Sequence, residues 1–165
     1  MVQILKVPNL TQIHKLNLCQ SSVNFLAFTI NAKLVASVFS ENMLIVKSMK
    51  NNKTVYVERN IKVKCAVFCL SNNSLVYSMS RSIVVIDKNY IKVAVLNIKN
   101  HADLLFLSRN NRTILVTGYT SRWSCIDSTT FKILFDNQSK KDLKNLRAKD
   151  VELRLLMSEP KINFS

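Results

Sequence analysis

The sequence predicts an all-β fold assembled from three similar units of about 40 residues. Short apolar runs recur with this period, and polar clusters rich in asparagine, serine and lysine separate them. Of the 165 residues, 48% are hydrophobic, which is enough apolar material for a core and excludes wholesale disorder. The length corresponds to one domain or to part of one.

The period is visible at several independent positions. Phe28, Phe68 and Phe106 recur at nearly equal intervals along the chain. Similar spacings relate three further sets: Leu34, Leu75 and Leu115; Val55, Val93 and Ile133; and Asn60, Asn97 and Asn137, which end the units. Independent agreement at these positions indicates a tandem repeat.

Each unit contains four short runs rich in Val, Ile, Leu, Phe and Tyr, a composition typical of β-strands. The expected strands are about 23–29, 34–39, 43–49 and 54–59, then 62–70, 75–79, 82–87 and 91–97, then 103–108, 113–119, 122–127 and 131–136. An earlier run, Ile13–Leu18, is apolar at alternate positions. We expect it to form an outer strand of a preceding unit or to pack on the first unit.

Asparagine stands in the turns where glycine is usual. The chain has one glycine in all, which excludes glycine-rich nucleotide-binding loops. Asparagine is the residue other than glycine that best tolerates a positive φ. We therefore expect Asn31, Asn51–Asn52, Asn72–Asn73 and Asn110–Asn111 to supply the tight turns.

Four strands in every unit of about 40 residues is the spacing of a propeller blade. The turns beginning at Phe28, Phe68 and Leu107 resemble the turn between the first two strands of WD40 repeats. Ile86-Asp87 and Ile126-Asp127 are similar to the Trp-Asp pair of that family.

The chain departs from the WD40 pattern at two points. The first unit has Val46-Lys47 and no acid at the Trp-Asp position, and the Gly-His dipeptide is absent, with only Asn100-His101 similar to it. The resemblance to degenerate WD40 repeats covers roughly residues 13–137. It implies a partial or incomplete WD40-like β-propeller of about three four-stranded blades.

The expected division of the chain follows from these repeats. An N-terminal strand and linker occupy residues 1–22, the three blades occupy 23–60, 61–98 and 99–137, and a C-terminal helix and tail occupy 138–165. A β-sandwich or another all-β domain with evenly spaced strands is the alternative to the propeller.

Three blades are too few to close a ring, because propellers have at least four. The two end faces are apolar, and leaving them open costs about 25 cal/mol for each Å² that is not buried. Large open patches usually mark interfaces. We expect a protein partner, a second copy of the chain or its own tail to cover the blade ends. The alternative is that the sequence is a fragment or a reduced form of a longer propeller.

Residues 139–157 are rich in helix formers, with Ser139 as a possible N-cap and Pro160 as a stop. Leu143, Leu146, Leu153 and Met157 keep a rough helical spacing. We expect this helix to dock on the last blade or to reach a partner, for which these four residues are the candidate contacts.

The net charge is +14, from 24 basic and 10 acidic residues, and such a domain attracts polyanions. Many basic side chains fall in turns or at strand ends, among them Lys33, Lys50, Lys53 and Arg81. The candidate RNA-phosphate contacts are Lys62, Lys64, Arg109, Arg112, Arg122, Lys140 and Lys141. A merely soluble basic surface, an acidic protein partner and a membrane surface are the alternatives.

No catalytic or metal-binding constellation is apparent. The four cysteines match no zinc spacing, and Cys65 and Cys69 are expected as free thiols on one buried strand face. His14 and His101 stand alone. We expect no cofactor and no metal. No apolar run is long enough for a membrane span, and no secretory signal is apparent, so an intracellular location, nuclear, nucleolar or cytoplasmic, is expected.

These observations favour a non-catalytic scaffold in a ribonucleoprotein assembly, such as a ribosome-bound or ribosome-biogenesis factor. The alternative is a protein-binding adaptor, as in a nuclear pore, coat or chromatin complex, without RNA contact. An enzyme is the third class, and only the missing motifs argue against it.

Overall fold

The computed structural model describes residues 22–69, 72–99, 101–118 and 122–137, together with two strands near the N-terminus, β1 (Val2–Lys6) and β2 (Thr11–Leu16). Every regular element within these ranges is a β-strand. The predicted C-terminal helix lies outside the described residues. Two sets of candidate residues therefore also lie outside them. These are the helix contacts Leu143, Leu146, Leu153 and Met157, and the RNA contacts Lys140 and Lys141.

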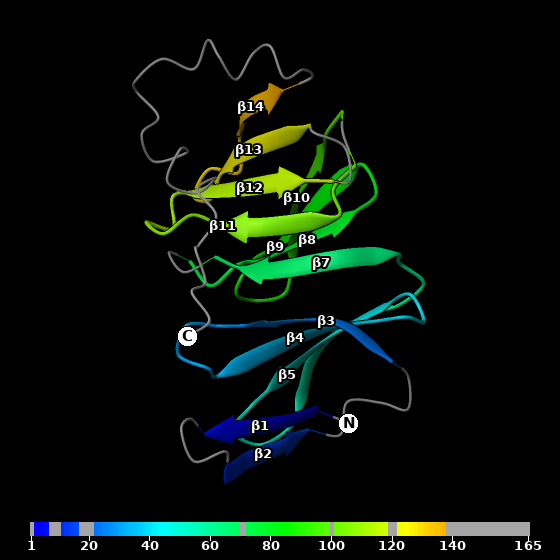
Figure 1. Ribbon diagram of the computed structural model, residues 1–165, viewed down its shortest axis with the longest axis vertical. Helices are drawn as coiled ribbons and strands as arrows, with labels where there is room; N and C mark the ends of the chain where they lie inside the picture. The colour runs from blue at the N-terminus through cyan, green and yellow to red at the C-terminus, as the bar shows by residue number, and fades with distance from the viewer. Residues whose placement is uncertain are drawn as a thin grey trace, which may run out of the picture.

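Twelve further strands form three antiparallel sheets of four, here called blades 1, 2 and 3 (Figure 1). Blade 1 contains β3 (Val23–Phe28), β4 (Leu34–Phe39), β5 (Met43–Ser48) and β6 (Thr54–Glu58). Blade 2 contains β7 (Val63–Phe68), β8 (Leu75–Met79), β9 (Ser82–Ile86) and β10 (Lys92–Asn97). Blade 3 contains β11 (Leu104–Leu107), β12 (Thr113–Thr117), β13 (Trp123–Asp127) and β14 (Ile133–Asn137).

Each strand of a blade pairs with the next strand in the chain, so no crossover occurs within the three blades. The predicted all-β class is confirmed, and the expected strand ranges agree with the observed ones to within a few positions at most ends. Greek-key crossings between two facing sheets, as a β-sandwich requires, do not occur among these twelve strands. The early run predicted at 13–18 falls on β2, whose partner β1 has no counterpart among the predicted strands.

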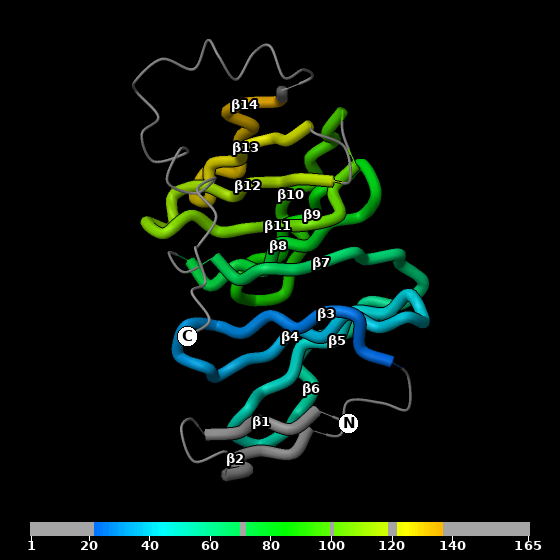
Figure 2. The backbone as a smooth tube through the Cα atoms, viewed as in Figure 1, coloured from blue at the N-terminus to red at the C-terminus, as the bar shows by residue number. Residues whose placement is uncertain are grey.

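The blades pack through their first strands, because β7 lies between β3 and β11 (Figure 1). Figure 2 shows the three blades following one another along the chain, from blue through green to orange. Blade 2 is therefore the middle layer, and both of its faces are covered.

The side chains of β8 explain how one sheet supplies two cores. Leu75 and Tyr77 belong to the core shared with blade 1, whereas Val76 between them belongs to the core shared with blade 3. Strand side chains alternate between the two faces of a sheet, so a strand buried on both sides has an unbroken apolar run. This is why the sequence Leu75-Val-Tyr77 shows no polar alternation.

The face of blade 3 that points away from blade 2 is partly open. Leu104 and Phe106 lie on this face and are 45% and 47% exposed, while Leu105 between them is buried in the core with blade 2. Trp123 is buried on the same face and stacks on Phe135, with ring centroids 5.2 Å apart.

Cys65 and Cys69 are free and fully buried in the core between blades 2 and 3, as their spacing predicts. Burial raises the pKa of the Cys65 thiol to about 11, despite an opposing contact of its Sγ with the Ser78 hydroxyl at 3.2 Å. Burial alone raises the pKa of Cys69 to about 12. Neither thiol is a nucleophile at neutral pH, because the thiolate is the reactive form.

Stability is expected to fall at alkaline pH. The two thiols stay protonated in the folded state above their ordinary pKa of about 8.5, so their contribution is complete below that pH and is lost as the pH rises through about 11 to 12. Urea unfolding at pH 8 and pH 10.5 measures this loss. A Cys65→Ala, Cys69→Ala variant should lose less between the two pH values, and an equal loss would contradict the account.

The buried hydroxyl of Tyr77 allows a second test of the packing in blade 2. Its side chain is fully buried, and its hydroxyl has no hydrogen-bond partner among the described residues. A buried hydroxyl without a partner costs roughly 1–3 kcal/mol. Tyr77→Phe should therefore leave the free energy of unfolding unchanged or raise it by about 1 kcal/mol, as measured by chemical denaturation. A loss of stability would show that the hydroxyl is hydrogen-bonded.

Candidate functional site: a basic rim

The blade topology brings half of the loops to one rim of the molecule. Because each blade has four antiparallel strands, every blade starts in the same direction as the one before it. The loops that join first to second strands and third to fourth strands therefore emerge at the same rim, here called the basic rim. Its loops are residues 29–33, 49–53, 69–74, 87–91, 108–112 and 128–132, of which 70 and 71 are not described.

The basic rim concentrates positive charge. Its loops carry seven exposed basic residues, which are Lys33, Lys50, Lys53, Lys88, Arg109, Arg112 and Lys132. The only acids in or next to these described loops are Asp87 and Asp127. The loops of the opposite rim carry five basic residues, Arg59, Lys62, Arg81, Lys99 and Arg122, against the acids Glu41 and Asp103. Counted within the loops alone, seven cations against Asp87 give the basic rim a net charge of +6, whereas five cations against Glu41 and Asp103 give the opposite rim +3.

Both acids of the basic rim are engaged in shaping their own turns. The Asp87 carboxylate accepts the backbone N–H groups of Asn89 and Ile91, both at 2.9 Å. The Asp127 carboxylate accepts the N–H groups of Thr130 at 2.6 Å and Thr129 at 2.9 Å. These backbone donors, led by that of Thr130, lower the pKa of Asp127, so it stays ionised and oriented toward the backbone.

The loop between the first two strands of blade 1 is built around one carboxamide. Asn31 Oδ1 accepts the Thr29 hydroxyl at 2.9 Å and the Lys33 N–H at 3.1 Å. Thr29 Oγ1 in turn accepts the Leu34 N–H at 3.0 Å. The loop thereby fixes the backbone of Lys33 at the rim, since an asparagine that bonds its neighbours forms a local turn.

Blade 3 repeats this construction. Asn110 Oδ1 accepts the Ser108 hydroxyl at 2.7 Å and the Arg112 N–H at 3.0 Å, and Ser108 Oγ accepts the Thr113 N–H at 3.0 Å. Arg112 therefore occupies the position of Lys33. The same hydrogen-bonded turn presents a basic residue in both blades.

The predicted role of asparagine at positive φ is correct for the second member of each pair only. Asn52, Asn73 and Asn111 have φ values of 54°, 55° and 59°. Asn51, Asn72 and Asn110 instead act as side-chain acceptors in their loops. After Asn31 the positive φ of 50° falls on Ala32, so Asn31 itself is an acceptor and that part of the prediction is wrong.

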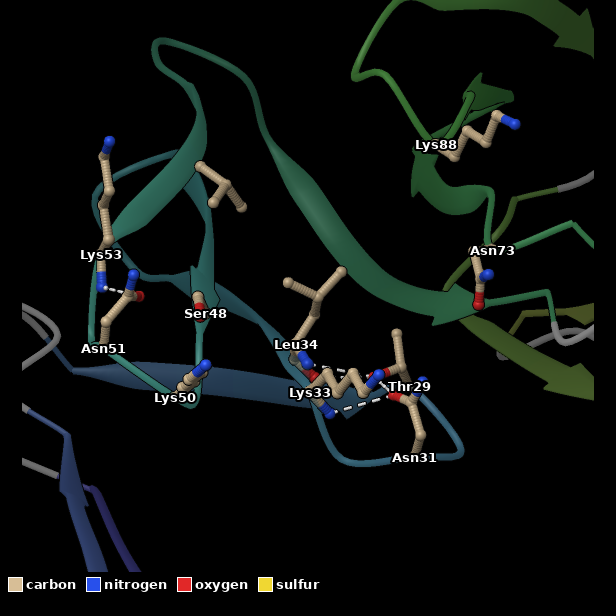
Figure 3. Close-up of a pocket in the computed structure, with 11 residues that line it drawn as sticks. Thr29, Asn31, Lys33, Leu34, Ser48, Lys50, Asn51, Lys53, Asn73 and Lys88 are labelled. Atoms are coloured by element: carbon tan, nitrogen blue, oxygen red, sulfur yellow. Dashed lines mark hydrogen bonds between the residues drawn. The ribbon is translucent and has the colours of Figure 1, made fainter.

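A cavity of about 740 Å³ opens on the basic rim between blades 1 and 2 (Figure 3). Lys33, Lys50, Lys53 and Lys88 line it, and they come from three different loops. Thr29, Asn31, Ser48, Asn51 and Asn73 add hydroxyl and carboxamide groups to its wall. Four lysines line this cavity and no acid is among its described lining residues, which provides a setting for phosphate or another anion.

The sequence-predicted contact residues are divided between the rims. Arg109 and Arg112 lie on the basic rim, whereas Lys62 and Arg122 lie on the opposite rim. Lys64, on β7, forms an ion pair with Asp103 at 3.6 Å. The four cavity lysines are not among the predicted contacts. Three of them fall in predicted turns, and the repeat pattern shows that these turns occupy equivalent positions in the units.

Metal and membrane features are absent from the part of the chain that the structure describes. No group of three His, Cys, Asp or Glu residues in it is arranged to hold a metal ion. It also contains no helix of the length and hydrophobicity needed to cross a membrane.

The sequence matches no protein-family profile and no curated protein. Among solved structures, the chain is similar to the beta-propeller domain of Cps50 (Swd1) from Myceliophteria thermophila, with a TM-score of 0.67 and 13% sequence identity. The match covers 83% of this chain and 48% of that domain, so the chain spans about half of its length. Together with the three four-stranded blades, this likeness shows a β-propeller fold, of which the described residues supply three blades.

The two asparagines of the blade 3 loop provide a matched pair of variants. Asn110→Gly removes an acceptor of two hydrogen bonds and should lower the free energy of unfolding by about 1–2 kcal/mol. Asn111→Gly should change it by less than about 0.5 kcal/mol, because glycine accepts the φ of 59° without strain. Chemical denaturation of both variants checks this order, and equal effects would contradict the assigned roles.

Proposed function

We propose that this protein is a non-catalytic scaffold that binds RNA phosphates at its basic rim within a ribonucleoprotein assembly, such as a ribosome-associated complex. The concentration of seven exposed basic residues on one rim carries this proposal. Phosphate neutralisation by such residues supplies most of the affinity of sequence-independent RNA binding. The proposed contacts are the four cavity lysines together with Arg109, Arg112 and Lys132.

Three features of the rim support phosphate binding without base recognition. The basic side chains are exposed, the nearby acids are held by their own turns, and the apolar aromatic residues lie mainly in strands. Base recognition in single-stranded RNA relies on exposed aromatic platforms. A rim of lysines and arginines instead follows the backbone and fixes the orientation of the partner.

A protein-binding adaptor without RNA contact is the second candidate. The open face of blade 3, with Leu104 and Phe106 nearly half exposed, favours it. Exposed apolar patches on sheet faces usually mark protein interfaces. The two roles differ in their dependence on salt, because apolar docking does not weaken as counterions are added.

The test is RNA affinity measured by fluorescence anisotropy over a salt series. The variant replaces Lys33, Lys50, Lys53 and Lys88 with alanine, and the matched control replaces Arg59, Lys62, Arg81 and Lys99 of the opposite rim. Both variants lose four positive charges from exposed loop positions. The rim variant should bind at least about 10-fold more weakly, and its slope of log K against log salt should fall by up to about 3.

The opposite-rim control should stay within about 3-fold of the unaltered protein. Equal weakening of both variants would show a diffuse charge effect and would contradict the basic rim as the RNA site. RNA binding that neither variant changes would exclude the basic rim.

A further inference from the structure

One loop of the basic rim separates two different surfaces. Thr29, Asn31 and Lys33 line the cavity of Figure 3, whereas Phe28 and Ile30 line an apolar groove. Successive side chains of this short segment thus belong alternately to the apolar groove and to the polar, basic cavity. The two sites are neighbours because they share the loop as a common wall.

The apolar groove lies where the innermost strands of the three blades meet the basic rim. It has a volume of about 320 Å³, and all of its described lining residues are apolar. Phe28, Phe68 and Leu107, which line it, are the last residues of β3, β7 and β11, and a loop of the basic rim follows each of them. Phe68 is buried, whereas Phe28 is 42% exposed and Ile30 is 74% exposed. The groove therefore has a buried floor and an accessible aromatic side chain at the rim.

Exposed basic side chains flank this groove on the same rim. The loop that contains Ile30 ends at Lys33, and the loop that follows Leu107 carries Arg109 and Arg112. The carboxamides of Asn31 and Asn110 fix the backbone at Lys33 and Arg112. Such a surface is complementary to a ligand that joins an apolar, planar face to a negative group.

From this juxtaposition we infer that the basic rim binds single-stranded RNA, with an unpaired base stacked on Phe28 in the apolar groove and with phosphates on the neighbouring lysines and arginines. The inference rests on the proposed function and specifies the form of RNA that the rim takes. Stacking accepts any base, because every base has a π-face, so this contact adds affinity without reading the sequence. A duplex offers its phosphates only, since its bases are already stacked within the helix.

A nucleotide fits this surface better than an apolar protein segment does. Each nucleotide joins a planar base to a phosphate, so a single ligand matches both the groove and the cations beside it. An apolar protein segment would cover Phe28 and Ile30 but would supply no negative charge to Lys33 and Arg112. The groove volume also lies at the lower end of the range for small-ligand pockets, about 300–1,000 Å³, which favours a base over a folded element.

The RNA affinity of a phenylalanine variant gives the first test. Phe28→Leu keeps an apolar side chain in the groove but removes the π-face. The matched control is Phe106→Leu, because Phe106 is also on an innermost strand and is 47% exposed, yet it does not line the groove. The two probes are a short single strand of mixed sequence and the same strand annealed to its complement. Chemical denaturation checks that both variants are folded under the binding conditions.

Phe28→Leu should bind the single strand at least about 5-fold more weakly and should leave duplex affinity within about 2-fold. The slope of log K against log salt should not change, because no phosphate contact is lost. Phe106→Leu should leave both affinities within about 2-fold. Unchanged affinity of Phe28→Leu for the single strand would overturn the inference, and the proposed function would stand if the four-lysine variant still bound RNA more weakly. Absence of RNA binding by the unaltered protein would overturn both.

Nuclear magnetic resonance separates direct stacking from an indirect effect of the substitution. On titration of the unaltered protein with the single strand, the ring-proton signals of Phe28 should shift more than those of Phe106, because a stacked base adds its own ring current. The duplex should not produce this difference. Signals of Phe28 that stay in place at saturation with the single strand would overturn the inference, even if Phe28→Leu bound more weakly.

Discussion

Val76 and Tyr77 are neighbours on β8, and their side chains are fully buried in two different cores. A sheet with this property is stable only between two other layers, because either face left open would expose an apolar surface. The burial of both faces of blade 2 therefore determines the stacking of the three blades. The same constraint applies to the end blades, which is why the outward face of blade 3, with Leu104 and Phe106, is the natural place for an interface.

The stacking in turn creates the basic rim. Because each blade has an even number of strands, the loops between first and second strands lie at the same rim in blades 1, 2 and 3. The loops between third and fourth strands lie at that rim as well. Hydrogen bonds to Asn31 and Asn110 then fix Lys33 and Arg112 at equivalent places, and Asp87 and Asp127 direct their charge toward their own backbone. A surface that concentrates positive charge at one rim thus results from repeated turn chemistry.

The strands could be predicted from the sequence because their apolar composition and regular period are local signals. The site could be predicted only in part, since rim membership depends on strand count and direction. Arg112 and Lys62 look alike in the sequence, yet they lie on opposite rims, and Lys64 lies opposite Asp103 only in space. The reason for glycine at position 118 also becomes visible only in the folded chain. The φ of Gly118 is not positive, but an added Cβ would lie 2.5 Å from the His101 carbonyl oxygen.

Nuclear Overhauser contacts of blade 2 test the stacked arrangement most directly. The stack predicts that the Tyr77 ring contacts methyl groups of blade 1 from the shared core, which includes Ala36, Val38, Leu44 and Val46. It also predicts that the Val76 methyls contact residues of blade 3 such as Ile114 and Val116. Contacts from both side chains to the same neighbouring blade, or to blade 2 alone, would contradict the stack.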